Sequence, residues 1–343
     1  MIEIKNKFAI GCIVQWYEIE LVEEYLQSVK NSIDLIDNKK NIIVDLYFNC
    51  GQALEKIDKN QITISDVKYK YNKLLKSIFN YDEDTNSIVG CDYNIHSFID
   101  ENNDSLYTIA NYRRDFNEKY CDLVDVLMWG ESDSLIPRQT FQILDNLHNQ
   151  VKHQTPKYVS FFSTCKMWDD SWKVLEHPEF TDKPFYDSPD DFKPDEHWWS
   201  LRYSMNIDEM NSFNDKVEDL DIRVLNQHKF NGCGLIISSE VIKAGVNIPR
   251  SVFFVHEDTS FMIILQKLLG LIPQYVIKNI LLVHNRNHPK KRLYVKDERL
   301  DGTMNEKRRS NDWYVRANEM SEKNCYNSLN PNYKAFTWDD VWK

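Results

Sequence analysis

The sequence contains no run of about 18 apolar residues, the length that a membrane-spanning helix needs. Its first residues reach polar side chains too early for a signal peptide, and they offer no small-residue cleavage site. These two absences predict a protein with no membrane span that stays in the cytoplasm, either of a bacterium or, for a viral protein, of the host cell.

Cysteine and glycine are used sparingly. The seven cysteines are scattered and odd in number, and no two form a C-x-x-C pair. This pattern argues against a disulfide framework and predicts free thiols in a reducing compartment. Glycine occurs only nine times, and together with abundant Asn, Lys and Ile this indicates an AT-rich coding sequence.

Positive charge is also in short supply over the chain as a whole. Lys and Arg number 42 against 53 Asp and Glu, so the formal net charge is −11 and the molecule should repel polyanions. The region from Lys278 to Arg316 is an exception, because it holds eleven basic residues against five acidic ones. We therefore expect a basic C-terminal tail, which either is a solvent-exposed surface without a partner or binds a polyanion.

The composition is otherwise that of a globular protein, with 42% hydrophobic and 13% aromatic residues in 343, and it excludes global disorder. Short apolar runs predict strands, and apolar residues at helical spacing predict helices between them. The predicted strands cover 8–14, 41–48, 88–91, 123–129, 158–163, 230–237, 252–255 and 277–283, and the predicted helices cover 18–29, 66–79, 105–120, 239–244 and 259–269. This alternation predicts an α/β protein whose parallel or mixed sheet is covered by helices on both faces.

One segment breaks the alternation. Residues 167–195 are dense in Trp, Asp and Pro and show little periodicity, which predicts a long structured excursion. Trp168, Trp172, Trp198 and Trp199 are suited to stacking on a sugar ring or a base. A small aromatic core under a long loop explains the same residues equally well.

Acidic residues follow two of the predicted strands, at the ends where open α/β sheets bind their ligands. Glu131 and Asp133 follow the strand at 123–129, and acids at this spacing can hold a hard divalent cation or simply cap the next helix. Glu257 and Asp258 follow the run at 252–255. Because neighbouring acids repel and burial favours the neutral form, one of them can become a general base, while Asp258 also suits a helix N-cap.

A third strand is followed by basic side chains instead of acidic ones. His284, Arg286 and His288 follow the strand at 277–283, which places imidazoles and a guanidinium beside the acids if the strands share one sheet.

Taken in order along residues 8–288, these segments resemble the GT-A type of nucleotide-sugar glycosyltransferases, in particular the broad family-2-like group. Residues 10–29 are similar to the first strand and helix of the family, and residues 111–116 to its arginine-bearing helix. Residues 129–133 stand where the family has its Asp-x-Asp motif, here with Glu first, and residues 230–237 resemble its glycine-containing strand. Glu257 and Asp258 match the acid pair that holds the catalytic base, and His284 matches a third metal ligand.

The resemblance implies a GT-A (Rossmann-like) mixed sheet flanked by helices over residues 1–290. It also implies an aromatic-rich insertion at about 167–227 and a C-terminal extension, 291–343, that packs on the catalytic domain. The implied enzyme is a hexosyl- or pentosyltransferase that uses Mn²⁺ or Mg²⁺ to move a sugar from a nucleoside diphosphate donor, with a UDP-sugar favoured, to an acceptor saccharide.

The same resemblance assigns roles to single residues. It implies that Asp133, Glu131 and His284 hold the metal and that Asp258 or Glu257 is the base. The residues implied at the nucleotide are Gln15, Tyr17, Glu18, Asn49, Arg113, Arg114, Gly232 and Gly234. For the acceptor we expect the tryptophans suited to stacking, together with a nearby histidine: Trp168, Trp172, Trp198, Trp199 and His288.

Two other functions stay open at this point. A DNA glycosyltransferase of the phage type, acting on hydroxymethylated bases, would fit the AT-rich coding sequence and the basic tail, and the Trp-rich segment would then probe the base. A non-catalytic nucleotide or carbohydrate binder is the other alternative, because a fold alone does not imply activity.

Overall fold

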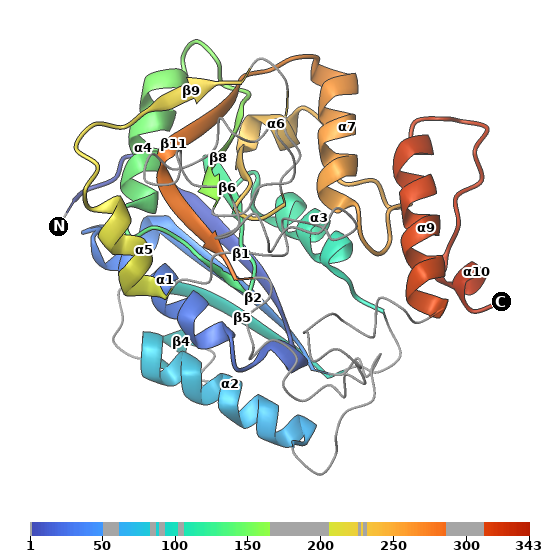
Figure 1. Cartoon of the computed structure of the whole chain (residues 1–343), viewed down its shortest axis with the longest axis horizontal. Coiled ribbons are helices and arrows are strands. Elements are labelled where there is room, and N and C mark those ends of the chain that lie inside the picture. Colours follow the sequence, from blue (N-terminus) through green and yellow to red (C-terminus); the bar gives the residue numbers. More distant parts are fainter. Residues whose placement is uncertain are drawn as a thin grey trace, which may run out of the picture.

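The centre of the molecule is a nine-stranded mixed sheet (Figure 1). The computed structural model describes residues 2–50, 62–82, 87–88, 93–101, 106–164, 206–225, 228, 232–285 and 312–343. Along the sheet the strands follow the order β5 (Asn94–Asp100), β2 (Ile42–Asn49), β1 (Phe8–Gln15), β6 (Val126–Trp129), β10 (Ile236–Ser238), β8 (Val159–Thr164), β11 (Gln274–His284) and β7 (Ser134–Leu135), with β9 (Ile222–Val224) also on β11.

Strand direction makes the sheet mixed. β1 pairs in parallel with β2 and β6, β2 with β5, and β8 with β11. β10 runs antiparallel between β6 and β8, and β7 and β9 are antiparallel to β11. The predicted α/β fold with a mixed sheet is therefore confirmed.

Helices cover both faces of this sheet, because its central strands are apolar on both sides. In β1, Phe8, Ile10, Cys12 and Val14 join one apolar cluster, and Ala9 and Ile13 join the other. The first cluster includes residues of α1 (Val22–Asp34), α2 (Ile64–Phe79) and α4 (Thr140–Val151), and the second includes residues of α3 (Ile109–Tyr120), α6 (Ser239–Lys243) and α7 (Glu257–Leu269).

Glycine in β1 allows α3 to lie close to the sheet. A Cβ atom on Gly11 would stand 2.5 Å from Cδ2 of Phe116 and 2.8 Å from Oη of Tyr112. Only a residue without a side chain lets this helix approach so closely. The approach matters because α3 carries Arg113 into the site described below.

Three short elements complete the main body of the described chain. The 3-10 helix η1 (Trp16–Glu18) directly follows β1, and the 3-10 helix η2 (Lys39–Asn41) directly precedes β2. The helix α5 (Ile207–Asn214) lies beside β11. A separate hairpin consists of β3 (Tyr81–Asp82) and β4 (Ser87–Ile88).

The predicted strand at 252–255 is wrong. This run is irregular, because Phe253 and Phe254 pack against the end of the chain and not within the sheet. The ring centre of Phe253 lies 4.9 Å from that of Trp338, the first residue of α10 (Trp338–Val341), which follows α9 (Asp312–Asn327). In Figure 1, α9 lies beside α7, and α10 lies against α9. The division of the chain at residue 290 stays a prediction.

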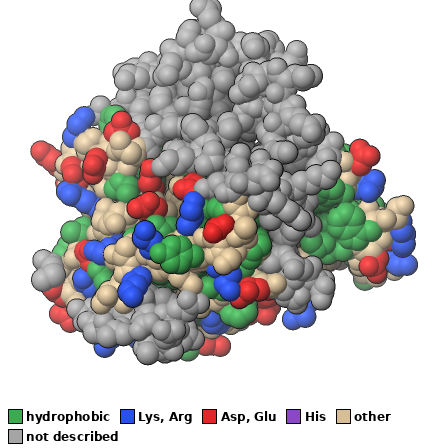
Figure 2. Space-filling model, turned by 90° about the horizontal axis from the view of Figure 1, so that it is seen from below, with side chains coloured by type: hydrophobic (Ala, Val, Ile, Leu, Met, Phe, Trp, Pro, Cys, Tyr) green, Lys and Arg blue, Asp and Glu red, His purple; other side chains and the backbone are tan. Residues whose placement is uncertain are grey.

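The described residues cover only part of the chain for which the sequence predicts no membrane span, a basic tail and a Trp-rich insertion. No helix within the described ranges is long and apolar enough to cross a membrane. Acidic and basic side chains are mixed over the described surface in the view of Figure 2. Most of the predicted basic tail, all four tryptophans of the predicted insertion and His288 lie outside the described residues.

Candidate active site

The turn after β6 carries two of the predicted metal ligands. The Gly130 N–H donates to the Gly11 carbonyl at 2.7 Å, so the turn continues directly from the middle of the sheet. A Cβ atom on Gly130 would lie 2.1 Å from the hydroxyl oxygen of Tyr25 in α1. The glycine thus lets the chain turn tightly against α1, and it brings the half-buried Glu131 and the buried Asp133 to the end of the sheet.

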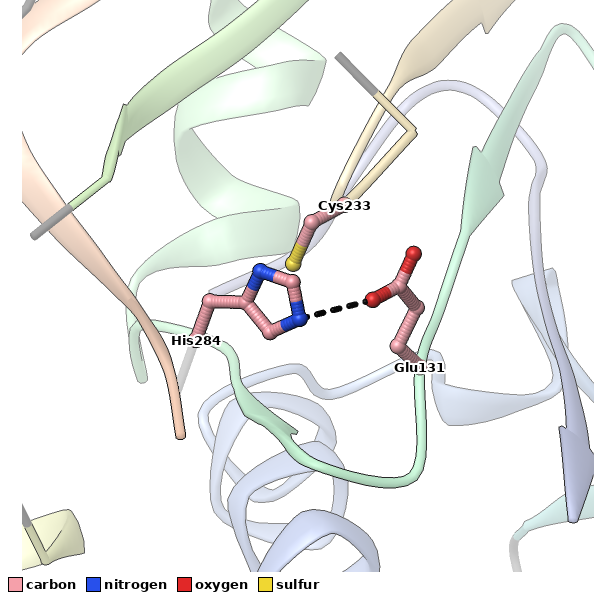
Figure 3. Close-up of side chains that lie close together, drawn as sticks. All are labelled: Glu131, Cys233 and His284. Atoms are coloured by element: carbon pink, nitrogen blue, oxygen red, sulfur yellow. Dashed lines mark ion pairs between the residues drawn. The ribbon is translucent and has the colours of Figure 1, made fainter. Parts of the chain in front are cut away.

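His284 reaches the same place from the end of β11. It pairs in the ladder with Ser134, directly after Asp133, and the next N–H, that of Asn285, donates to the Asp133 carbonyl at 2.8 Å. The His284 Nε2 atom lies 3.0 Å from Oε2 of Glu131 (Figure 3). The same nitrogen lies 3.6 Å from Oδ1 of Asp133. The structure therefore brings all three predicted metal ligands together.

Arg113 links this group to the acids at the start of α7. Its guanidinium is 1% exposed and lies 4.8 Å from the ring centre of Trp129. Nη2 donates to Oε1 of Glu131 at 2.7 Å, and Nη1 donates to Oε1 of Glu257 at 2.6 Å. A single side chain thus joins the predicted metal side of the site to the predicted base side.

The acids of α7 follow a residue with unusual backbone geometry. His256 has φ of 69°, in the left-handed region, and it stands directly before Glu257. Asp258 accepts a hydrogen bond from the Thr259 N–H at 2.7 Å. A Cβ atom on Gly232 would lie 2.7 Å from Nη1 of Arg113 and 3.2 Å from Oδ2 of Asp258, so the absence of a side chain at 232 lets both groups lie close to the backbone of this turn.

The local charges shift several pKa values. Burial alone would raise the pKa of Glu131, but His284 and Arg113 outweigh it and lower that pKa to about 2. Burial alone would lower the pKa of His284, but the Cys233 sulfur and the two nearby carboxylates hold it well above the usual 6.5. Burial raises the pKa of Glu257 to about 7, since Arg113 opposes this rise only in part and Asp258 adds to it.

Negative charge is in excess at this end of the sheet. Glu18 joins the site from the chain after β1, where its Oε2 accepts from the Ser132 hydroxyl at 2.6 Å. The carboxylates gathered here are those of Glu18, Glu131, Asp133, Glu257 and Asp258, and the opposing groups are Arg113 and His284. Buried carboxylates repel one another, so this arrangement favours binding of a cation.

Three of the remaining predicted nucleotide residues lie at or just after the ends of strands. Gln15 ends β1, and Tyr17 is buried beside Trp16 at a ring distance of 5.4 Å. Asn49 is buried at the end of β2, where it donates to the Tyr107 carbonyl at 3.2 Å.

Gly234 and Arg114 have contacts of other kinds. Gly234 has φ of 70°, and a Cβ atom there would lie 2.6 Å from Leu282, so this glycine is required by the turn. Arg114 is buried too, but its ion pair is with Asp115 at 3.4 Å, and it is Arg113 that contacts the carboxylates.

Cys233 was not predicted to belong to the site. Its Sγ atom, a ring nitrogen of His284 and a carboxylate oxygen of Glu131 all lie within 4.8 Å of one another. The sequence signal was present, because Cys233 stands between the two glycines assigned to the donor. It did not identify the residue, because nothing in the spacing showed which way the thiol points.

Comparison with known proteins gives only a distant likeness. No protein-family model matches the chain, and no curated protein matches it. Among solved structures, the chain is similar to the crystal structure of S. aureus TarS 1-349, with a TM-score of 0.46 and 10% sequence identity. The match covers 81% of this chain and 60% of that structure, so it spans less than two thirds of TarS 1-349.

Proposed function

We propose that this protein is a metal-dependent glycosyltransferase that moves a sugar from a nucleoside diphosphate donor to an acceptor hydroxyl. The observation that carries the proposal is the meeting of Glu131, Asp133 and His284 at one end of the sheet, with Arg113 connecting them to the acid pair of α7. The order of these segments is the one that the resemblance to GT-A enzymes implies.

The donor set fits a divalent cation. Two carboxylates and an imidazole are ligands that Mn²⁺ accepts readily, and the excess of buried negative charge needs a counterion. Asp133, Glu131 and His284 would hold the ion. A bound Mn²⁺ or Mg²⁺ supplies positive charge that offsets the charge developing on the diphosphate as it leaves.

The residues of the chain divide the remaining work. Asp258 is better placed than Glu257 to act as the base, because its half-buried carboxylate is more accessible to an acceptor hydroxyl. Glu257 is only 7% exposed, and one of its carboxylate oxygens accepts a hydrogen bond from Arg113. In the proposed reaction Asp258 takes the proton of the acceptor hydroxyl as that oxygen attacks the anomeric carbon. Arg113 holds Glu131 and Glu257 in fixed positions, and the absence of a side chain at Gly232 lets Asp258 and the Arg113 guanidinium lie close to the backbone there.

Donor turnover tests this proposal. The purified chain is incubated with Mn²⁺ and a panel of nucleoside diphosphate sugars, and release of nucleoside diphosphate is measured. Asp133→Ala and Asp258→Asn should each abolish release while the thermal unfolding transition is kept. Asp208→Ala, at an exposed acid in α5, is the matched control and should release the nucleotide at the wild-type rate.

The same assay separates an enzyme from a binding protein. Nucleotide diphosphates that bind should raise the melting temperature in the presence of Mn²⁺, because a ligand that binds only the native state stabilises it. Binding without any release of nucleoside diphosphate would support the non-catalytic alternative. Full release by both site variants would refute the assigned roles.

A further inference from the structure

We propose that the Cys233 thiol is a ligand in the cation site, and that the site therefore prefers a thiophilic divalent cation such as Zn²⁺ over Mg²⁺ and Mn²⁺. This inference rests on the cation site of the proposed function. It adds a ligand of a different chemical class and, with it, a different order of metal preference.

Three side chains from three different elements point toward one place. Sγ of Cys233, one ring nitrogen of His284 and one carboxylate oxygen of Glu131 lie within 4.8 Å of one another. Figure 3 shows them approaching from the turn before β10, the end of β11 and the turn after β6. These segments are far apart in sequence, so their meeting follows from the sheet and not from local spacing.

Backbone hydrogen bonds hold Cys233 at this place. The Gly234 N–H donates to the Trp129 carbonyl at 3.1 Å, and the Trp129 N–H donates to the Leu235 carbonyl at 2.9 Å. The turn with Cys233 is thereby attached to the strand that ends two residues before Glu131. The tight packing of Gly234 on Leu282 also places this turn against β11, two residues before His284.

Because both neighbours of Cys233 are glycines, its thiol is the side-chain ligand that residues 232–234 provide. Gly232 and Gly234 have no side chain, and the space for one is taken at 232 by Arg113 and at 234 by Leu282. Cys233 is 4% exposed, so its thiol faces the inside of the site and not the solvent.

The chemistry of the donor set determines which ion it selects. Thiolate sulfur is a soft ligand that favours Zn²⁺ and Co²⁺, whereas Mg²⁺ prefers oxygen ligands alone. One sulfur, one imidazole nitrogen and one carboxylate oxygen are ligand types found at zinc sites. Asp133, 3.6 Å from the His284 nitrogen, lies near the same group.

Cobalt spectroscopy on the full chain tests the proposal directly. The protein is freed of metal with a chelator and titrated with Co²⁺, and the near-ultraviolet charge-transfer band of a thiolate–cobalt bond is recorded. The wild type should show the band, and Zn²⁺ should abolish it by displacing Co²⁺. Cys121→Ser, which alters another buried thiol at the end of α3, is the matched control and should keep the band.

Metal selectivity gives a second, independent readout. The affinities for Zn²⁺ and for Mn²⁺ are measured by titration calorimetry. Cys233→Ser should reduce the ratio of the Zn²⁺ affinity to the Mn²⁺ affinity at least about tenfold relative to the wild type, since even outer-sphere partners change metal affinity by about 10–100-fold. Cys233→Ala should behave in the same way.

The outcomes separate this inference from the proposed function. If the wild type binds Co²⁺ without a thiolate band, the role of Cys233 is refuted, and Mn²⁺ binding that is lost in Asp133→Ala still supports the glycosyltransferase site. If the chain binds none of these cations, both proposals fail.

Discussion

Replacing Glu257 by glutamine should make the metal-free protein more stable above neutral pH. Two effects oppose each other at this residue. Burial disfavours the charged carboxylate, and the guanidinium of Arg113, 2.6 Å away, favours it. Because Arg113 is shared with Glu131 and because Asp258 adds negative charge, burial dominates and raises the pKa of Glu257 to about 7.

The size and sign of the effect follow from this pKa. A rise from the usual 4.5 to about 7 corresponds to about 3 kcal/mol, at about 1.4 kcal/mol per pKa unit. The folded protein holds this proton more tightly than the unfolded chain. The contribution of Glu257 to the free energy of unfolding therefore falls as the pH rises from about 4.5 to about 7, and it is constant above that range.

Glutamine removes the titration but keeps an amide oxygen that can accept from Arg113. Glu257→Gln should thus match the wild type near pH 5 and exceed its free energy of unfolding by up to about 3 kcal/mol at pH 8. The assay is urea unfolding, followed by tryptophan fluorescence at several pH values with EDTA present. Glu319→Gln, at an exposed glutamate of α9, should stay within about 0.5 kcal/mol of the wild type throughout.

A less stable Glu257→Gln variant at pH 8 would refute the reasoning. It would mean that the ion pair with Arg113 stabilises the charged carboxylate more than burial destabilises it.

Substitutions at three further positions test other parts of the structure, and each is followed by urea unfolding. Gly11→Ala should lower the free energy of unfolding by about 1–3 kcal/mol, because the new methyl group overlaps Phe116; wild-type stability would show that α3 can move away from the sheet. His256→Val should be about 1–2 kcal/mol less stable than His256→Asn, because asparagine tolerates the left-handed backbone and valine does not; equal stability would mean that the segment relaxes to another conformation. Arg113→Met should destabilise the protein by about 3–5 kcal/mol at pH 8 and by less at pH 5, because it leaves two carboxylates without their partner; a loss that does not depend on pH would contradict this account.

The sequence predicted the fold where the apolar pattern was strong. The runs that became β1, β2, β6 and β8 are buried on both faces, so their composition reports their environment. β5 was missed, with a strand expected at 88–91, because it is an edge strand in which burial does not follow the apolar residues: Phe98 is exposed, whereas Asp100 is buried. The run at 252–255 was misinterpreted because an apolar segment does not reveal whether it pairs with a strand or packs on a distant helix.

The site was predictable to the extent that it lies at strand ends. Glu131 follows β6 and His284 ends β11, so the rule for ligand sites in open sheets predicted that these two residues lie at the same end of the sheet. The bridging role of Arg113, the contact of Glu18 with Ser132 and the position of Cys233 could not be predicted in this way. Each depends on how far one element approaches another, which is set by packing at residues such as Gly11 and Gly130.

Arg113 also constrains how the site can change over time. Both ends of its guanidinium are engaged, by Glu131 on one side and Glu257 on the other. Loss of Arg113 leaves two carboxylates in the interior without their partner, so a tolerated replacement at 113 requires compensating replacements at 131 and 257. In related chains we therefore expect positions 113, 131 and 257 to covary, while the exposed neighbours of the same helices drift independently.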